Sequence, residues 1–182
     1  ADLDLLEQLT AEASLVLQRL WQVMHLKEKG RQLESLISAG QSLVTKLEQQ
    51  ELFDTLSREA RNTLRARAGA LYLYDPQQRT VRCAAFTDGA LAPPAAGELP
   101  IASCLVASPI HTRRTVWFPD IQSPEYQELL DLPADPGLRS VLASPMLYEG
   151  EVLGVVTVFT DRVHRFDNDE KRLCNALASL GA

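Results

Sequence analysis

A pair of apolar strands over residues 139–160 constrains the fold of this chain more than any other segment. Glu149 and Gly150 interrupt the pair, and glycine readily accepts the positive φ angle that a two-residue hairpin turn requires. The second strand carries apolar residues on both of its faces. We assign Leu153, Val155 and Phe159 to one face and Val152, Val156 and Val158 to the other. A strand with one wet face alternates apolar and polar residues, so we expect this strand at the centre of a sheet that is covered on both faces.

The composition excludes several classes of function. The 182 residues suit one domain with an extension, and the net charge of -6 argues against a nucleic-acid partner. No apolar run approaches the ~20 residues of a membrane span, so we expect no membrane contact by this chain. The three cysteines form no Cys-x-x-Cys pair, which argues against a zinc site and favours a reducing cytoplasm. The abrupt ends favour a piece of a longer protein, which could be the cytoplasmic part of a membrane-anchored sensor.

Residues 1–66 contain no proline and follow a helical repeat. Apolar residues recur at spacings of three and four in two separate phases, Leu6, Leu9, Ala13, Val16, Leu20 and Val23 and then Leu33, Leu36, Gly40, Leu43 and Leu47. Each interior glycine costs ~1 kcal/mol relative to alanine, so Gly30 and Gly40 predict bends, breaks or close helix contacts. The segment is either one or two helices packed on their own domain or a parallel dimer stalk. We favour the stalk, because so narrow a seam suits a coiled coil.

The remaining elements alternate between strands and short helices. An amphipathic helix over 48–66 turns Leu52, Phe53, Leu56, Ala60 and Leu64 to one side. Strands are expected over 70–75, 80–86 and 115–118, a mobile loop over 87–100, and helices from Ser108, over 124–131 and over 167–180. Asp167 and Glu170 form a capping box for the last helix, whose apolar face we assign to Leu173, Ala176, Leu177 and Leu180. The order predicts an α+β fold with helices behind an antiparallel sheet.

Five local patterns, taken in order, resemble the GAF family of sensory domains over residues 41–180. They are the helix followed by Arg67-Ala-Gly-Ala-Leu-Tyr-Leu-Tyr-Asp75, the strand Trp117-Phe-Pro-Asp-Ile121, the strand Arg139-Ser-Val-Leu-Ala-Ser-Pro-Met146, the hairpin Gly150-Glu-Val-Leu-Gly-Val155, and Phe166 with Asp169 and Glu170. The resemblance implies a GAF domain at 41–182, after a signalling or coiled-coil helix at 1–40. It also implies a sheet of order 2-1-5-4-3, with helices on one face and a small-molecule pocket on the other.

The same resemblance implies a regulatory and non-catalytic role in signal transduction. Members of the family commonly form homodimers through their first and last helices and control an output domain, such as a histidine kinase or a cyclic-nucleotide enzyme of a two-component or related system. Here the output domain would lie outside the chain, and the ligand and cofactor are unknown. Ala102, Cys104, Ala107 and Arg113 stand where the family often has glycine or an open floor, so a closed pocket that serves only dimerisation is the alternative. Asp161 and Arg162 depart from the cyclic-nucleotide pattern, and residues 132–138 lack the cysteine of bilin-binding members.

Five residues besides Cys104 are candidates for contact with a ligand. Phe86, Trp117 and Tyr126 could form aromatic walls of a pocket, or simply pack in the core. Arg139, with Ser144, could hold an anionic or carboxylate ligand, because arginine suits bidentate pairing. The competing account for Arg139 is a salt bridge to Asp120 or Asp135.

Cys104 is the candidate thiol at the expected pocket mouth. A helix N-terminus nearby would lower its pKa and make it reactive, whereas a free cysteine is otherwise a small buried hydrophobe. One branch of the GAF family reduces free methionine sulfoxide with cysteines, and Cys83 and Cys104 motivate that alternative, although its surrounding motifs are missing. No nucleophile elbow, P-loop, zinc-protease or dinucleotide motif occurs, and no histidine has metal-ligand spacing to another histidine or cysteine.

Overall fold

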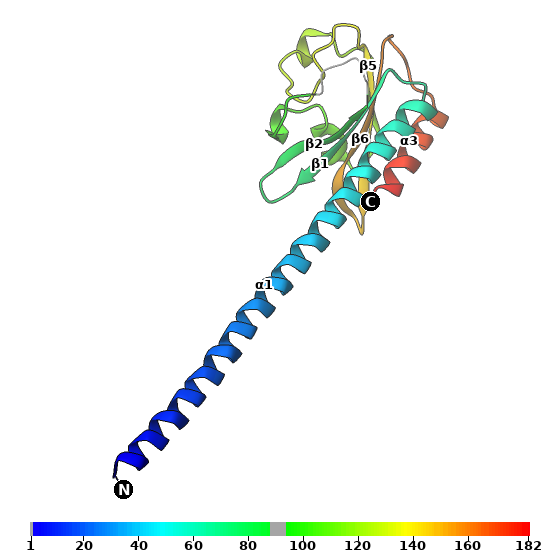
Figure 1. Ribbon diagram of the computed structural model, residues 1–182. Coiled ribbons are helices and arrows are strands. Elements are labelled where there is room, and N and C mark those ends of the chain that lie inside the picture. Colours follow the sequence, from blue (N-terminus) through cyan, green and yellow to red (C-terminus); the bar gives the residue numbers. More distant parts are fainter. Residues whose placement is uncertain (1, 88–93) are drawn as a thin grey trace. The chain divides into compact units, whose positions relative to one another are not determined.

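A computed structural model of the chain describes residues 2–87 and 94–182. Between residues 2 and 36 it describes the side chains of a few positions only: Arg19, Gln22, Met24, residues 27–29, Arg31, Glu34 and Ser35. The chain divides into two compact units, residues 1–47 and residues 48–182. The first unit is helical, and the second contains all the strands (Figure 1).

The first helix, α1 (Asp2–Thr63), is a single element. It continues through Gly30 and Gly40, so of the predicted bends, breaks or close helix contacts, a break is excluded. A Cβ atom added at Gly40 would meet nothing within 4 Å, so this glycine does not serve a close contact within the chain either. The first phase of the heptad seam, with Leu33 and Leu36 of the second, lies outside the described side chains. In the described part of the seam, Leu43 and Leu47 are exposed, and the stalk stays a prediction.

The second unit is built on a six-stranded antiparallel sheet of order β3-β2-β1-β6-β5-β4. Its strands are β1 (Ala68–Asp75), β2 (Thr80–Thr87), β3 (Glu98–Pro100), β4 (Val116–Phe118), β5 (Ser140–Tyr148) and β6 (Glu151–Thr160). The prediction did not include the short edge strand β3. When β3 is left out and the other five strands are renumbered along the chain, the order becomes the predicted 2-1-5-4-3. β5 and β6 form the expected hairpin, and β6 pairs with β1 on its other side. The turn uses positive φ at both Glu149 (48°) and Gly150 (84°), as a two-residue hairpin of the primed type does.

A bulge in β6 corrects the predicted faces of this strand. Met146 pairs with Gly154 but Leu147 pairs with Val152, so Leu153 is an extra residue between the two pairs. An extra residue reverses the alternation beyond it. Val152 therefore packs with Val155 and Phe159, whereas Leu153 is 39% exposed. Val156 and Val158 face the opposite layer, as expected.

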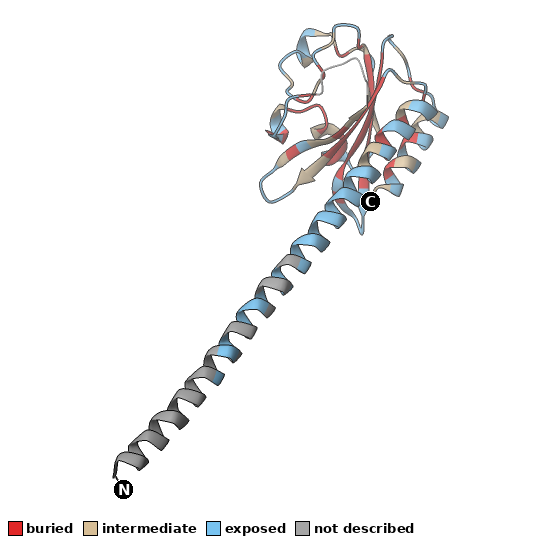
Figure 2. Ribbon diagram, in the orientation of Figure 1, coloured by how far each residue is buried: buried red, intermediate tan, exposed pale blue. Residues whose placement is uncertain are grey.

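Two helices cover one face of the sheet. The end of α1 and α3 (Asn168–Leu180) lie side by side there (Figure 1), and Leu56, Ala60, Cys174 and Ala178 are buried against the strands (Figure 2). A Cβ atom at Gly69 of β1 would collide with the backbone carbonyl of Ser57 in α1. Glycine at this position therefore allows the helix to approach the sheet closely.

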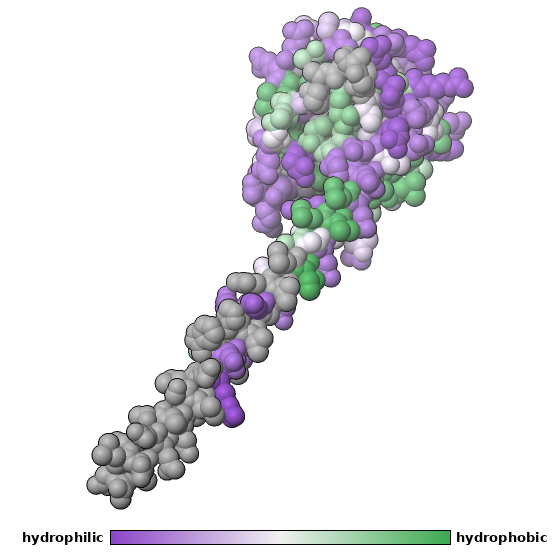
Figure 3. Space-filling model, viewed as in Figure 1, coloured by the Kyte–Doolittle hydropathy of each residue, from purple (hydrophilic) through white to green (hydrophobic). Residues whose placement is uncertain are grey.

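The capping box of α3 is confirmed, but its apolar face is only partly as predicted. The Asp167 carboxylate accepts from the Glu170 N–H, and the Glu170 carboxylate accepts from the Asp167 N–H, both at 2.8 Å. Leu173 (44% exposed) and Leu180 (72%) face away from the core. Apolar patches interrupt the largely hydrophilic surface of the second unit in Figure 3.

Loops and short helices cover the other face. They include the single-turn 3₁₀ helices η1 (Ile101–Ser103) and η2 (Pro124–Tyr126) and the helix α2 (Ala107–Thr112). Ser108 lies inside α2 and does not cap it, and the predicted helix over 124–131 is reduced to η2. Of the predicted loop over 87–100, residues 88–93 lie outside the described residues, and Glu98–Pro100 is β3. Leu105, Val106 and Ile110 from this layer pack on the sheet.

Candidate functional site

A hollow of about 350 Å³ lies in the connection between β4 and β5. Its lining combines apolar residues with a phenol, two amides and a carboxylate: Ile121, Gln122, Tyr126, Gln127, Leu129, Leu132, Pro133, Ala134, Asp135 and Pro136. An apolar cleft with a few polar groups is the usual form of a small-molecule site. We call it the β4–β5 hollow.

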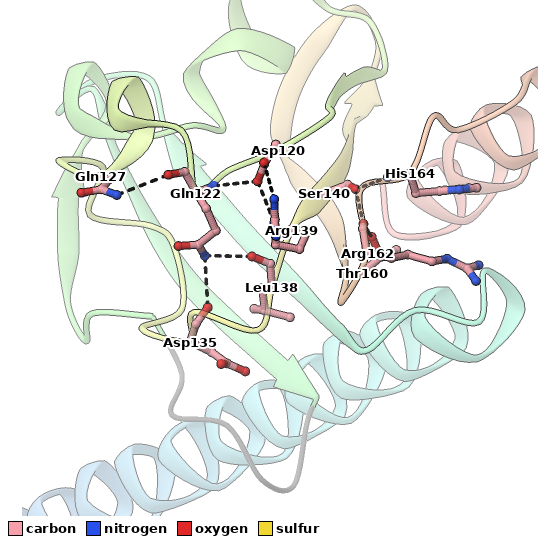
Figure 4. A network of polar contacts seen from close by, with 10 residues as sticks. All are labelled: Asp120, Gln122, Gln127, Asp135, Leu138, Arg139, Ser140, Thr160, Arg162 and His164. Carbon is pink, nitrogen blue, oxygen red and sulfur yellow. Dashed lines mark hydrogen bonds and ion pairs between the residues drawn. The ribbon is translucent and has the colours of Figure 1, made fainter.

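Gln122 organises the polar side of the β4–β5 hollow (Figure 4). Its Nε2 donates to the backbone oxygens of Leu138, at 2.8 Å, and Asp135, at 3.3 Å. Its own backbone oxygen accepts from Gln127 at 3.3 Å, and its N–H donates to Asp120 at 3.1 Å. One amide side chain thus joins two segments of the connection and fixes the shape of the hollow.

Arg139 forms the predicted salt bridge to Asp120. Its Nε and Nη2 donate to the two carboxylate oxygens of Asp120, at 3.0 and 2.6 Å (Figure 4), which is the bidentate geometry expected of arginine. The hydrogen bond from Arg139 lowers the pKa of the Asp120 carboxyl, and Asp120 raises the pKa of Arg139. The guanidinium is therefore already engaged with a carboxylate of the same chain.

The three aromatic candidates are not on one wall. Tyr126 lines the β4–β5 hollow and makes an edge-to-face contact with Phe118 at 5.7 Å. Phe86 is half-buried on the loop side of the sheet and borders a separate hollow of about 340 Å³, together with Cys83. Trp117 packs on the helix side, where Lys171 lies 5.4 Å from its ring centroid.

Ser144 and Cys104 also lie apart from the β4–β5 hollow. Ser144 is buried on β5, where its hydroxyl bonds to Thr115 Oγ1 at 2.8 Å and Asn175 Oδ1 at 3.4 Å. Cys104 is buried in the loop-side core, and its thiol donates to the Pro100 carbonyl at 3.4 Å. Burial, followed by the charge of Asp131, raises the Cys104 pKa to about 12. Six residues predicted for one pocket are thus divided between two faces of the sheet, and their ligand contacts stay predictions.

Asp131 is a buried carboxylate that the sequence reasoning did not single out. Its oxygens accept from the N–H groups of Leu105, at 2.7 Å, and Val106, at 3.0 Å. Burial raises its pKa, and these hydrogen bonds oppose the rise. An Asp between Leu130 and Leu132 was the available signal, since acidic residues are rarely buried without partners. Gln122 gave no comparable signal, because its partners are backbone groups that only the folded connection brings near.

The sequence matches the GAF domain family model over residues 46–182. The chain belongs to the GAF domain family. The match begins near the boundary between the two compact units and a few residues after the expected start at residue 41. No curated protein matches the sequence.

Solved structures similar to this GAF domain include GAF domains of other proteins and a methionine sulfoxide reductase. A GAF domain from an Acinetobacter phosphoenolpyruvate-protein phosphotransferase is 18% identical, with a TM-score of 0.62 over 73% of this chain and 79% of that one. A type II free methionine-R-sulfoxide reductase from Thermoplasma acidophilum is 17% identical, with a TM-score of 0.63 over 75% and 92%. A GAF domain/HD domain protein from Geobacter sulfurreducens is 25% identical, with a TM-score of 0.57 over 73% and 88%.

The described residues include no candidate membrane span and no candidate metal cluster. None of their helices combines the length and the apolar character that crossing a membrane requires. No cluster of three or more histidine, cysteine, aspartate or glutamate side chains suited to a metal ion was found among them.

Proposed function

We propose that this GAF domain is a non-catalytic regulatory domain that binds a small molecule in the β4–β5 hollow. It forms a homodimer through its N- and C-terminal helices and acts on an output domain outside the chain. The observation that carries the proposal is the hollow itself, whose shape is held by the Gln122 hydrogen bonds. The similar GAF domains of a phosphotransferase and of a GAF/HD protein support a role in a multidomain signalling protein.

The lining of the hollow favours a ligand with an apolar body and hydrogen-bond donors. Ile121, Leu129 and Leu132 offer apolar contact, and the Asp135 carboxylate offers acceptor capacity beyond its bond to the Gly137 N–H. Tyr126 can accept or donate through its phenol. A neutral or cationic metabolite fits this set better than an anion, because the nearby Arg139 already pairs with Asp120.

Hydrogen bonds, joined by the peptide bond between Arg139 and Ser140, lead from the hollow to the last helix. The Ile121 N–H donates to the Arg139 carbonyl at 2.6 Å, and the Arg139 N–H donates to Thr160 at 2.7 Å. Next to Arg139, the Ser140 hydroxyl accepts from the His164 N–H at 2.6 Å (Figure 4). The His164 ring bonds to Glu170, the capping residue of α3. A ligand that shifts Ile121 would thereby shift the start of α3, a helix of the proposed dimer.

Native mass spectrometry of the freshly purified chain tests ligand binding and dimerisation together. We expect a dimer that carries additional small-molecule mass, and we expect Tyr126→Ala to lose that mass while it remains a dimer. Tyr148→Ala, an exposed tyrosine at the hairpin, is the matched control and should retain it. A bare dimer in every preparation, without binding in a metabolite screen, would contradict the sensor role.

The exposed leucines of α3 provide the test of the dimer. Leu173→Glu with Leu180→Glu should convert the dimer to a monomer in analytical ultracentrifugation, because charged residues are depleted at interface cores. Val163→Glu changes an apolar residue of similar exposure outside the helices and should leave the dimer intact. A dimer unaffected by the double change would exclude this face of α3 from the interface.

The alternative is a GAF domain with a closed pocket that serves only dimerisation. Its supporting observation is that Tyr72 crosses the space between the sheet and the loop layer, where its phenol donates to the Asp131 carbonyl at 2.6 Å. Side chains rather than a ligand then fill the interior. A dimer that binds no metabolite, and whose α3 packing is unchanged by Tyr126→Ala, would favour this alternative.

A thiol-based methionine sulfoxide reductase is the third candidate, and the fold of the Thermoplasma acidophilum enzyme is its support. The thiols oppose it. Burial raises the pKa of Cys83 to about 11 and that of Cys104 to about 12, so both are protonated at neutral pH, whereas the thiolate is the nucleophile. Slow reaction of both thiols with a disulfide reagent near neutral pH is expected. Two results together would support the reductase reading. The thiols would react fast, and the chain would reduce methionine sulfoxide in a reaction that Cys83→Ser and Cys104→Ser abolish.

A further inference from the structure

Another hollow, of about 650 Å³, lies on the helix side of the sheet, away from the proposed ligand site. It is lined by Arg113, Arg114, Thr115, Leu147, Asn168, Lys171, Arg172 and Asn175. Three arginines and a lysine thus contribute four positive charges, and no lining residue is acidic. This concentration occurs in a chain whose net charge is -6. We call the surface the basic hollow.

Two elements bring the cations together. Asn168, Lys171, Arg172 and Asn175 are spaced by three and four residues on α3, so they share one side of that helix. The two adjacent arginines come from the connection between α2 and β4, where Arg113 adopts the left-handed conformation (φ 54°) that ends α2. The basic hollow is therefore a product of the tertiary fold rather than of one charged run.

A buried hydroxyl orients the floor of the basic hollow. Ser144, on β5 and fully buried, donates to Asn175 Oδ1 at 3.4 Å, and its hydroxyl lies 2.8 Å from the Thr115 hydroxyl. Because the amide oxygen of Asn175 is used in this chain, its NH₂ group is the end that remains for a bound acceptor. The floor thus adds a neutral donor to the surrounding cations.

The charges of the basic hollow are only weakly compensated by the contacts found around it. Arg172 lies 3.8 Å from Asp169, and both side chains are more than four-fifths exposed, so the pair contributes little. Lys171 stacks on Trp117 at 5.4 Å, a contact that positions the ammonium group without neutralising it. A partner that supplies carboxylates would find most of this charge available.

We propose that the basic hollow binds an acidic segment of a partner polypeptide, one in which aspartate or glutamate residues alternate with apolar residues. Leu147, 39% exposed, adds an apolar wall that a simple anion would not use. The three arginines are exposed on an open surface and Lys171 is half-buried, whereas a small metabolite is normally enclosed. The acidic chain as a whole disfavours a nucleic acid. This docking surface is independent of the β4–β5 hollow.

Fluorescence anisotropy with a labelled peptide of repeated Glu-Glu-Leu units tests the proposal on the full 182-residue chain. We expect binding at low salt that weakens as salt is added, and little binding of the Gln-Gln-Leu analogue. Arg114→Glu with Arg172→Glu should weaken binding by about tenfold or more, because attraction becomes repulsion at two positions. The matched control reverses two exposed arginines on and beside β2, Arg79→Glu with Arg82→Glu, and should bind as the unchanged chain does.

Three results would overturn the proposal. The first is an absence of binding to the acidic peptide at low salt. The second is an equal loss of peptide binding in the two double variants. The third is binding to phosphatidylserine-containing vesicles that needs no peptide but requires Arg114 and Arg172. The last result would assign the surface to anionic headgroups. If circular dichroism shows that the reversal unfolds the chain, Arg114→Gln with Arg172→Gln removes the charges without introducing new ones, and it should weaken peptide binding in the same direction.

Discussion

The phenol of Tyr72, on β1, donates a hydrogen bond of 2.6 Å to the backbone carbonyl of Asp131 in the connection between β4 and β5. The carboxylate of the same aspartate holds the N–H groups of Leu105 and Val106, just before α2. Three parts of the second unit, the sheet, the start of α2 and the β4–β5 connection, therefore meet at one buried residue. This junction joins the loop layer to the sheet.

Tyr72→Phe should destabilise the fold by about 1 kcal/mol, because the carbonyl of Asp131 loses a buried donor. Burial, reinforced by the charge of Asp131, raises the pKa of Tyr72 well above 10.0. The folded state therefore retains a proton that the unfolded chain releases above pH 10, and stability falls as the pH rises through this value. The variant should lack this alkaline loss. Urea unfolding at about pH 8 and about pH 11 measures both effects, and the exposed Tyr148→Phe should change neither.

Asp131→Ala should be more damaging, by about 2–4 kcal/mol, since two buried N–H groups lose their acceptor. Asp131→Asn retains one carbonyl oxygen and should cost less.

The raised pKa of Asp131 means that the folded state holds its proton more tightly than the unfolded chain does. Its contribution to stability therefore decreases as the pH rises above the ordinary aspartate pKa of 3.8. The decrease should be absent in Asp131→Asn when the free energy of unfolding is followed across the acidic range. Equal stability of the Asp131→Ala variant and the unchanged chain would contradict a stabilising role for the hydrogen bonds of Asp131 with the Leu105 and Val106 N–H groups.

Gly69→Ala and Gly40→Ala should have opposite effects. At Gly69 the added methyl would collide with the backbone of Ser57, and separating α1 from β1 should cost about 1–3 kcal/mol. At Gly40, inside α1, the methyl meets nothing within 4 Å, so alanine should favour the helix by about 1 kcal/mol. Thermal unfolding followed by circular dichroism compares the two variants. A neutral Gly69→Ala would contradict the close approach of this helix to the sheet.

Asp120→Asn should reduce the loss of stability in acid. The hydrogen bond from Arg139 lowers the pKa of Asp120 below the ordinary aspartate value of 3.8. The stabilisation is therefore present above that value and is lost as the pH falls through the lower pKa of the folded state. Denaturant midpoints between about pH 2 and about pH 6 should show a shallower decline in the variant. An unchanged decline would mean that other carboxyl groups account for it.

The hairpin of residues 139–160 and the capping box of α3 were predictable because their signals are local. A glycine at a turn, doubly apolar alternation and an Asp-x-x-Glu spacing each act within a few residues. The antiparallel sheet followed from these elements together, whereas its strand order came only from the resemblance to the GAF family. Of the outcomes predicted at Gly30 and Gly40, a break of α1 does not occur, because a cost of about 1 kcal/mol per glycine is small beside the remainder of a long helical segment.

The tertiary structure decided which face each side chain occupies. One extra residue, Leu153, reverses the alternation near the end of the hairpin, and nothing in the local pattern marks it. Trp117 and Ser144 face the helices rather than the β4–β5 hollow, while Gln122 and Asp131 acquire their roles through backbone groups of other segments. Sequence periodicity determines which elements form, because it reflects local geometry. The site depends on the register and on long-range hydrogen bonds, which exist only after the elements have packed.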